Sequence, residues 1–123
     1  MLDFNFVLLH VADSAASAKF YRDLLGIPII SEVPGFAMLP LREGVTLGLW
    51  LRETVEPKTS GETGASEISF AVADKAAIAA LHADWQARGL PILQPPAEVG
   101  FGTTFTAQDP DGHRLRVVAP PAA

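Results

Sequence analysis

The fold of this protein is decided by one stretch of sequence that occurs twice. The first copy is VADSAASAKFYRDLLGIPI at residues 11–29, and the second is VADKAAIAALHADWQARGLPI at residues 72–92. In both copies an aspartate precedes a run of helix-forming residues, and a Gly-x-Pro-Ile segment follows it. A later landmark repeats as well, since Gly44 and the strand after it match Gly112 and its strand. Landmarks that recur in the same order indicate a duplicated structural unit.

Each copy predicts a helix with defined ends. Asp13 and Asp74 are typical N-cap residues, because their carboxylates can accept the unpaired backbone N–H groups of a first helical turn. Gly26 and Gly89 are suited to the left-handed conformation that closes a helix. The predicted helices are residues 14–25 and 75 to about 88.

Strands are expected on both sides of each helix, because apolar residues alternate there with a period of two. One strand precedes each helix and three shorter strands follow it, which makes a βαβββ unit. Prolines flank or interrupt the strand after the second helix, so this strand is expected at the edge of its sheet. The predicted strands are 4–11, 29–33, 36–41 and 45–51 in the first unit, and 67–73, 92–93, 103–107 and 114–118 in the second. The prolines are Pro91, Pro95 and Pro96.

The duplicated unit predicts an α+β fold in a single domain, residues 1–123. Its two βαβββ modules are expected at about 1–55 and 66–119. The segment 53–65 joins them, and its Gly, Thr, Ser and Pro content is typical of a mobile loop.

Composition restricts the classes of function. The chain has 49% apolar residues, no cysteine and a formal net charge of −5. A disulfide framework and a thiolate metal site are therefore excluded, and an acidic chain without a basic cluster does not favour a nucleic-acid partner. No apolar run is long enough to cross a membrane, and the N-terminus lacks the features of a signal peptide. We therefore expect a cytoplasmic protein with neither a nucleic-acid nor a membrane partner.

Side-chain alternation assigns one face of each sheet to a helix and leaves the other face for a ligand. On the second helix, Ile78, Leu81 and Trp85 share one face, so Trp85 is expected in the core. The residues that should point away from the helices are aromatic and apolar in the first unit, but polar and charged in the second.

The duplicated βαβββ unit, the segment FYRDLLG at residues 20–26 and the segment DPDGH at residues 109–113 resemble the vicinal oxygen chelate superfamily, which contains glyoxalases, bleomycin-resistance proteins and dioxygenases. The resemblance spans nearly the whole chain. It implies that the two modules curl their mixed sheets into a U-shaped cup with the helices outside. It also implies a homodimer, whose cups often include residues of both chains.

The resemblance further implies where a metal would bind. Enzymes of this superfamily hold a divalent metal with His and Glu side chains at four inner-strand positions, which correspond here to Phe6, Gly48, Glu67 and Arg116. Only Glu67 can ligate a metal, because phenyl and glycine offer no lone pair and a guanidinium group is itself a cation. We therefore expect no metal, no cofactor and no catalytic residue of the family type.

What remains favours the binding of a planar aromatic molecule. Trp50 and Phe6 could stack on it, an arginine such as Arg116 could bind its carboxylate, and Gly48 is expected to leave an opening in the floor of the cup. Gly48-Leu49-Trp50, the Trp85…Pro91 spacing and residues 101–105 resemble phenazine-resistance members, which are thought to sequester a planar antibiotic. The expected function is therefore metal-independent drug binding in antibiotic resistance. The expected ligand-binding residues are Phe6, Phe36, Met38, Gly48, Trp50, Glu67, Ser69, Thr104, Arg114 and Arg116, with Thr106 on the same face.

Other interpretations stay open. The chain could be a metal-dependent lyase, isomerase or dioxygenase with a displaced site, such as Glu67 with His10 or His113. It could equally be a structural or regulatory domain whose cup is closed by side chains. Trp50 could fill the cup or a dimer interface, and Glu67 and Arg116 could form an ion pair that binds nothing. The histidines His10, His82 and His113 are each expected to be solvated rather than catalytic.

Overall fold

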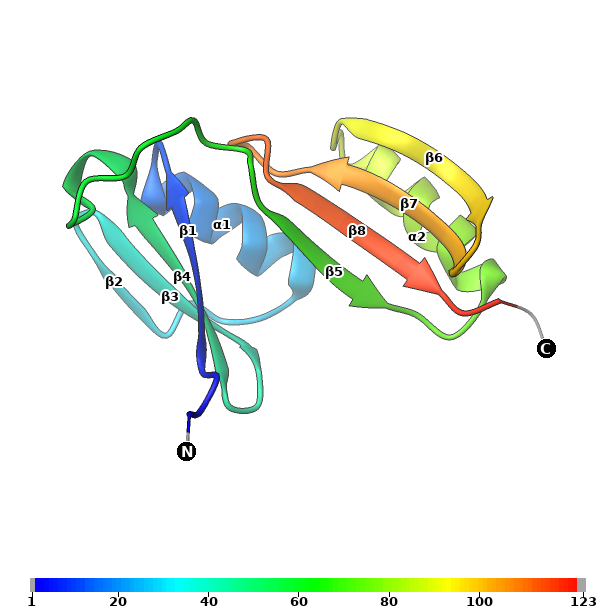
Figure 1. The fold of residues 1–123 in the computed structure, drawn as a ribbon, viewed down its shortest axis with the longest axis horizontal. Coiled ribbons are helices and arrows are strands. Elements are labelled where there is room, and N and C mark those ends of the chain that lie inside the picture. Colours follow the sequence, from blue (N-terminus) through cyan, green and yellow to red (C-terminus); the bar gives the residue numbers. More distant parts are fainter. Residues whose placement is uncertain (1, 122–123) are drawn as a thin grey trace. The chain divides into compact units, whose positions relative to one another are not determined.

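The computed structural model describes residues 2–121, which form two compact units that meet in sequence at Thr63 and Gly64. Both units are βαβββ, so the predicted α+β class and repeat are confirmed (Figure 1). The first unit contains β1 (Phe6–Val11), α1 (Ser14–Leu25), β2 (Ser31–Val33), β3 (Phe36–Arg42) and β4 (Val45–Leu51). The second contains β5 (Glu67–Ala71), α2 (Lys75–Ala87), β6 (Ile92–Val99), β7 (Gly102–Gln108) and β8 (Arg114–Ala119).

Each unit has its own four-stranded mixed sheet, and the two sheets have the same topology. The strand orders are β1-β4-β3-β2 and β5-β8-β7-β6. The first strand of each unit pairs in parallel with the last, and the remaining pairs are antiparallel. In each unit the helix connects the parallel pair and packs on the sheet, so one face of each sheet is covered by the unit's helix and the other face is open within that unit.

The helices begin as the sequence predicts. Asp13 Oδ1 accepts a hydrogen bond from the Ala16 amide at 3.0 Å, and Asp74 Oδ1 accepts one from the Ala77 amide at 2.9 Å. Gly26 closes α1 with a left-handed φ of 66°, which only glycine adopts without strain. The second helix ends at Ala87, one residue earlier than expected.

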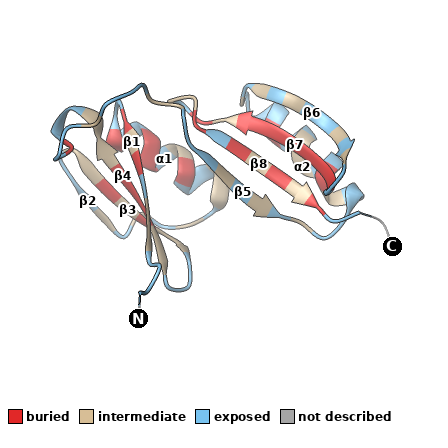
Figure 2. Cartoon of the chain, in the orientation of Figure 1, coloured by how far each residue is buried: buried red, intermediate tan, exposed pale blue. Residues whose placement is uncertain are grey.

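The core of the first unit lies between α1 and its sheet, where the helix-facing residues are almost completely buried (Figure 2). Leu47 and Leu49 of β4 are fully buried, while Thr46 and Trp50 on the alternate positions are only half-buried. The alternation predicted from the sequence therefore describes this sheet correctly. The other core residues are Leu9, Val11, Ala18, Tyr21, Ala37 and Leu39.

The core of the second unit is built around Phe105 of β7. Its ring lies edge-on to Trp85, with ring centroids 5.3 Å apart, and edge-on to His82 at 5.5 Å. Trp85 is 3% exposed, so its expected place in the core is confirmed. Ile78, Leu115 and Val117 complete this core and are fully buried.

The expectation that the histidines are solvated is wrong for His113, which is 3% exposed. The DPDGH turn folds inward because the Asp109 carboxylate accepts hydrogen bonds from the backbone amides of Asp111 and His113, both at 2.9 Å. His82 is also half-buried, since its ring packs on Phe105.

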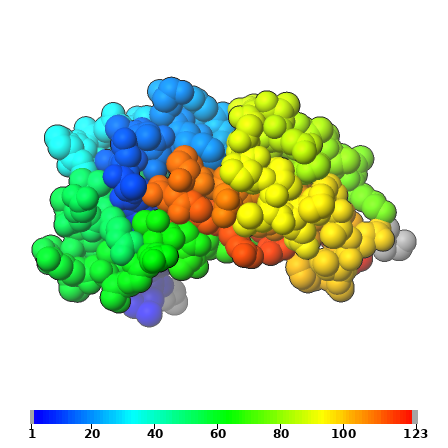
Figure 3. Space-filling model, turned by 90° about the horizontal axis from the view of Figure 1, so that it is seen from above, coloured from blue at the N-terminus to red at the C-terminus, as the bar shows by residue number. Residues whose placement is uncertain are grey.

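Strand β6 is longer than the two residues predicted for it. It runs through Pro95 and Pro96, where its pairing with β7 shifts register between Gln94 and Ala97. Proline lacks an N–H group and is tolerated at an edge or a bulge, and β6 is the edge strand that the sequence predicts. The space-filling view shows this segment at the surface, in yellow (Figure 3).

Several other boundaries differ from expectation: β2 begins at Ser31 rather than at residue 29, and β5 ends at Ala71 rather than at residue 73. β1 begins at Phe6 rather than at residue 4, because its parallel pairing with β4 starts there, and Phe4 is 71% exposed. The segment expected as an irregular loop begins with a short 3-10 helix, Arg52–Thr54, and the Arg52 guanidinium donates a hydrogen bond to the Gly61 carbonyl. Within residues 2–121, neither helix is long and apolar enough to span a membrane.

Candidate functional site

The open face of the first sheet is mainly aromatic and apolar along β1, β3 and β4. Five of the residues expected to bind a ligand lie on it, on strands β1, β3 and β4. They are Phe6, Phe36, Met38, Gly48 and Trp50. The strand pairing adds three neighbours on the same face, Leu8, His10 and Thr46.

Gly48 does not leave the opening that the sequence suggested. A Cβ atom at this position would lie 2.6 Å from Leu8 Cδ2, 2.7 Å from Phe6 Cε1 and 3.2 Å from Phe36 Cζ. The missing side chain is therefore replaced by the ends of three neighbouring ones, which converge on the strand. Glycine here permits a continuous apolar surface rather than a hole.

Trp50 lies beside this surface and is held by two rings. Phe36, directly across on β3, meets it edge-to-face with centroids 5.9 Å apart and an interplanar angle of 71°. His10, directly across on β1, meets it at 6.4 Å and 83°. Edge-to-face packing of this kind is a favoured geometry for aromatic pairs. Trp50 is half-buried, so part of it remains accessible to a ligand.

The open face of the second sheet is polar, and its centre is Arg116 of β8. The guanidinium Nε donates to Glu67 Oε2 at 3.0 Å, and Nη2 donates to Glu67 Oε1 at 3.4 Å. Its Nη1 donates to Gln94 Oε1 at 3.3 Å and to Thr104 Oγ1 at 3.4 Å. Glu67 and Arg116 therefore form the ion pair considered in the sequence analysis, and it is one part of a larger network.

This network is partly buried. The Arg116 side chain is 21% exposed, the Glu67 side chain is 40% exposed, and Thr104 is fully buried. Thr104 also donates a hydrogen bond from its hydroxyl to the Val117 carbonyl at 2.8 Å. The hydroxyl group thus links the guanidinium to the backbone of β8, which restricts the orientation of the arginine.

Gln94 is the member of this network that the sequence did not suggest. Its Oε1 accepts from both Arg116 and the Thr106 hydroxyl, the latter at 3.4 Å. The predicted strand ended at residue 93, one residue before Gln94. A strand continuing through the prolines would have placed Gln94 beside Thr106.

The remaining predicted residues of this face are Ser69 and Arg114, and both are exposed. Strand register places Ser69 directly across from Arg116 and Arg114 directly across from Glu67. Neither is part of the hydrogen-bonded network described above.

The residues at the four family metal positions do not fit a divalent metal. Phe6 and Gly48 provide no donor atom, and the one carboxylate, Glu67, is engaged by the guanidinium of Arg116. No group of three or more His, Cys, Asp or Glu side chains that could hold a metal ion occurs within residues 2–121.

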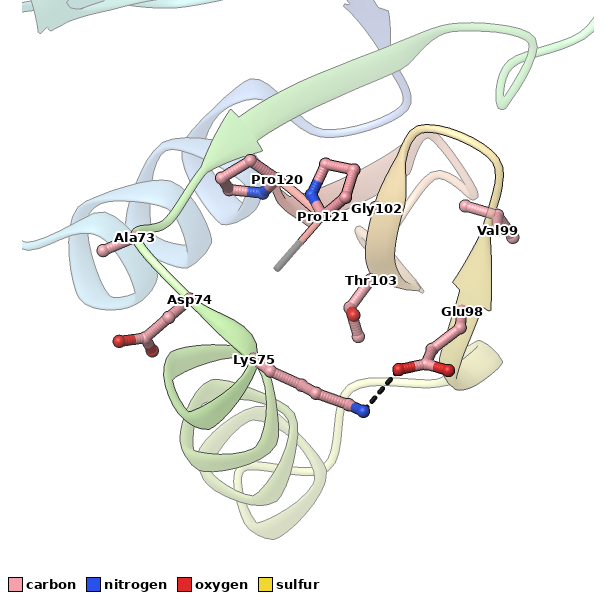
Figure 4. A pocket seen from close by; sticks show the side chains of 9 residues that line it. All are labelled: Ala73, Asp74, Lys75, Glu98, Val99, Gly102, Thr103, Pro120 and Pro121. Carbon is pink, nitrogen blue, oxygen red and sulfur yellow. Dashed lines mark hydrogen bonds and ion pairs between the residues drawn. The ribbon is translucent and has the colours of Figure 1, made fainter. Parts of the chain in front are cut away.

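Two surface pockets lie on the helix side of the sheets, away from the predicted ligand residues. One, of about 490 Å³, lies between the N-terminus of α2 and the β6–β7 hairpin, and Lys75 forms an ion pair with Glu98 at its rim (Figure 4). The hydrogen bond from Lys75 lowers the pKa of the Glu98 carboxyl. The other, of about 540 Å³, lies at the equivalent place in the first unit, where Asp13 and Glu32 are among its lining residues. Because both units contain it, this pocket follows from the geometry of the βαβββ unit.

Comparison with protein-family models identifies one family. The model of the Glyoxalase/Bleomycin resistance protein/Dioxygenase superfamily matches residues 3–117. A protein from Agrobacterium tumefaciens, solved in solution by NMR, is 44% identical with a TM-score of 0.89, and the match covers 99% of this chain and 100% of that one. A glyoxalase/bleomycin resistance protein/dioxygenase from Nocardioides is 26% identical with a TM-score of 0.80, over 100% of this chain and 86% of that one.

A third structure, lactoylglutathione lyase from Agrobacterium tumefaciens, is 19% identical with a TM-score of 0.76, over 94% of this chain and 92% of that one. At this identity the likeness is one of fold. Among curated proteins, none matches the chain.

Proposed function

Because the chain belongs to the glyoxalase/bleomycin resistance protein/dioxygenase superfamily, we propose that it binds a flat, conjugated small molecule without the aid of a divalent metal, and that it sequesters this molecule rather than transforming it. A phenazine-type antibiotic or metabolite has the required chemistry. The binding surface is the open face of the first sheet, with Trp50 and Phe6 as stacking platforms.

The observation that carries this proposal is the aromatic cluster around Gly48. Phe6, Leu8 and Phe36 converge over the glycine, and Phe36 also packs against Trp50. An apolar surface beside an indole ring that packs against two others favours a flat hydrophobic molecule, because ring contacts add about 0.5–1.5 kcal/mol to the free energy gained by burying apolar area.

The donor chemistry supports metal independence. A family-type metal site needs several nitrogen or oxygen ligands around one ion, and of the four corresponding positions only Glu67 carries one. The competing proposal is a metal-dependent lyase, isomerase or dioxygenase. It would need further nitrogen or oxygen ligands beside Glu67 to hold a metal ion.

Calorimetric titration with phenazine-1-carboxamide tests the proposal, carried out on purified protein with and without EDTA. We expect saturable one-site binding that EDTA does not change, and the same ligand should raise the melting temperature. The exposed Phe101, on the β6–β7 hairpin, provides a control, since Phe101→Ala should bind like the parent protein. Absence of binding by planar aromatics would contradict the proposal, as would a stoichiometric metal whose removal abolishes binding.

A further inference from the structure

The pocket of about 490 Å³ in the second unit combines three polar side chains with an apolar lining (Figure 4). Lys75 is the first residue of α2, Glu98 lies near the end of β6, and Thr103 lies near the start of β7. Pockets of roughly 300–1,000 Å³ are large enough for a small molecule. All residues of this pocket belong to the second unit, and the apolar ones are Ala73, Val99, Gly102, Pro120 and Pro121.

The hydroxyl group of Thr103 lacks a partner in this pocket. Thr103 is 8% exposed, and within residues 2–121 its hydroxyl makes no hydrogen bond, whereas those of Thr104 and Thr106 are both bonded. Figure 4 shows the Thr103 side chain directed into the pocket, toward the ion pair of Lys75 and Glu98. Buried polar groups are normally paired, so an unpaired hydroxyl that faces a pocket indicates a ligand with a hydrogen-bonding group.

The equivalent pocket of the first unit carries neither Lys nor Thr at the corresponding positions. Ser14 follows the N-cap residue of α1, as Lys75 follows that of α2. Ala37 takes the place of Thr103, since each pairs with a glutamate on the neighbouring edge strand. The shape of the pocket is therefore a property of the βαβββ unit, while the ammonium group and the threonine hydroxyl are additions of the second unit.

We propose that this pocket binds a small α-amino acid with an apolar side chain. The carboxylate of the ligand accepts hydrogen bonds from the Lys75 ammonium group and the Thr103 hydroxyl, and the ammonium group of the ligand donates to Glu98. The start of α2 adds to the attraction, because the N–H groups of a first helical turn favour an anion. The apolar side chain of the ligand lies against Val99 and the two prolines.

The charges of the pocket fit a zwitterion better than a simple anion. Lys75 and Glu98 form an ion pair at the rim, with side chains that are 68% and 70% exposed. Such an exposed pair contributes little to stability, so a ligand with one charge of each sign can insert between the two groups and pair with both. Asp74 does not oppose the carboxylate of the ligand, since it caps the Ala77 amide and points away from the pocket (Figure 4).

Three probes of matched shape separate these contacts. L-Valine carries both charges, isovalerate lacks the ammonium group, and isobutylamine lacks the carboxylate. NMR titration of the full chain, followed at the Thr103 amide, should show saturation by L-valine with a dissociation constant of roughly 1 mM or lower. Each of the other two probes should bind about tenfold more weakly, which is the scale of one charge-assisted hydrogen bond.

Three variants test the three polar groups one at a time. Thr103→Val removes the hydroxyl at nearly constant volume, so it should weaken L-valine about tenfold without lowering the melting temperature, because the hydroxyl has no partner to lose. Lys75→Met should weaken L-valine and isovalerate alike, and Glu98→Gln should abolish the preference for L-valine over isovalerate. Lys19→Met, at an exposed lysine of α1 that pairs with Asp23, is the charge-matched control and should bind L-valine like the parent.

The proposal is overturned if L-valine does not bind saturably, or if either Lys75→Met or Thr103→Val binds it as tightly as the parent. Equal affinity of the parent for L-valine and isovalerate would show that Glu98 does not receive an ammonium group, and the amino-acid class would then be wrong. Titration with phenazine-1-carboxamide tests the proposed function separately, since its binding surface is made of first-unit residues.

Discussion

The side chains of Glu67 and Arg116 meet in a forked contact, with Nε 3.0 Å from Oε2 and Nη2 3.4 Å from Oε1. The two residues lie on adjacent parallel strands but are not direct cross-strand partners, since Glu67 pairs with Arg114 and Arg116 with Ser69. The diagonal arrangement lets Arg116 reach Gln94 on the other side as well. Arg116 of β8 is therefore hydrogen-bonded to Glu67 of β5 and to Gln94 of β6.

We expect Glu67 and Arg116 to be energetically coupled. Each single variant, Arg116→Met or Glu67→Gln, removes one partner and leaves the other without it. The two single losses in the free energy of unfolding should therefore add up to more than the loss in the double variant. For a pair with these exposures the coupling energy should be about 0.5–1.5 kcal/mol. Urea unfolding of the four proteins measures it. Additive single effects would show that the contact contributes nothing to stability.

Gly48→Ala should destabilise the first unit. The added methyl group would lie within 2.7 Å of both Leu8 and Phe6, which must move away. Because these atoms are the ends of flexible side chains, the expected loss is about 1 kcal/mol, the lower end for overpacking. Gly100→Ala is the matched control, since its methyl group would meet no atom within 4 Å. Equal stability of the two variants would refute the close packing over Gly48.

Trp50→Ala should weaken the binding of planar aromatics by about tenfold or more, because both the ring contact and the buried area are lost. The affinity of Trp50→Phe for these molecules should lie between that of Trp50→Ala and that of the parent. Fluorescence titration provides a second measurement, since ligand stacking should quench Trp50, while Trp85 is buried in the other unit's core and serves as the reference. If Trp50→Ala bound planar aromatics as tightly as the parent, Trp50 would not be part of the binding surface.

The Glu98 carboxyl should titrate at a lower pH than in a Lys75→Met variant. The hydrogen bond and charge of Lys75 lower the pKa of Glu98 from its ordinary value of 4.5. Any stability from the pair is therefore present above that value and lost as the pH falls through the lowered pKa. NMR titration of the carboxyl carbon measures the difference, which should shrink in 1 M salt. Identical midpoints in the two proteins would mean that the pair does not form in solution.

We also predict a homodimer, as the family resemblance implies. The first unit exposes Phe4 by 71% and Leu8 by 44%, apolar surface that a second copy of the chain could cover. Sedimentation velocity at micromolar concentration should give a dimer, and Phe4→Ser should shift the equilibrium toward monomer. A monomer over the whole concentration range would refute the prediction.

The local structure of this protein could be read from its sequence because it depends on neighbouring residues. Asp13 and Gly26 mark the two ends of α1, and the alternation along β4 identifies Leu47 and Leu49 as core. Prolines correctly indicated the edge strand but not its length, because the register shift between Gln94 and Ala97 depends on the partner strand.

Chain periodicity and helix-capping residues specify the duplicated βαβββ unit, its helix ends and the face of each residue on the predicted strands. Two features became visible only in three dimensions. The space at Gly48 is filled by Phe6, Leu8 and Phe36. The guanidinium of Arg116 is hydrogen-bonded to Glu67 and Gln94, while Arg114 lies outside this network. The reason is that a strand position fixes the face of a side chain but not its direction within that face. That direction is chosen by neighbours on strands distant in the sequence, through packing and hydrogen bonding.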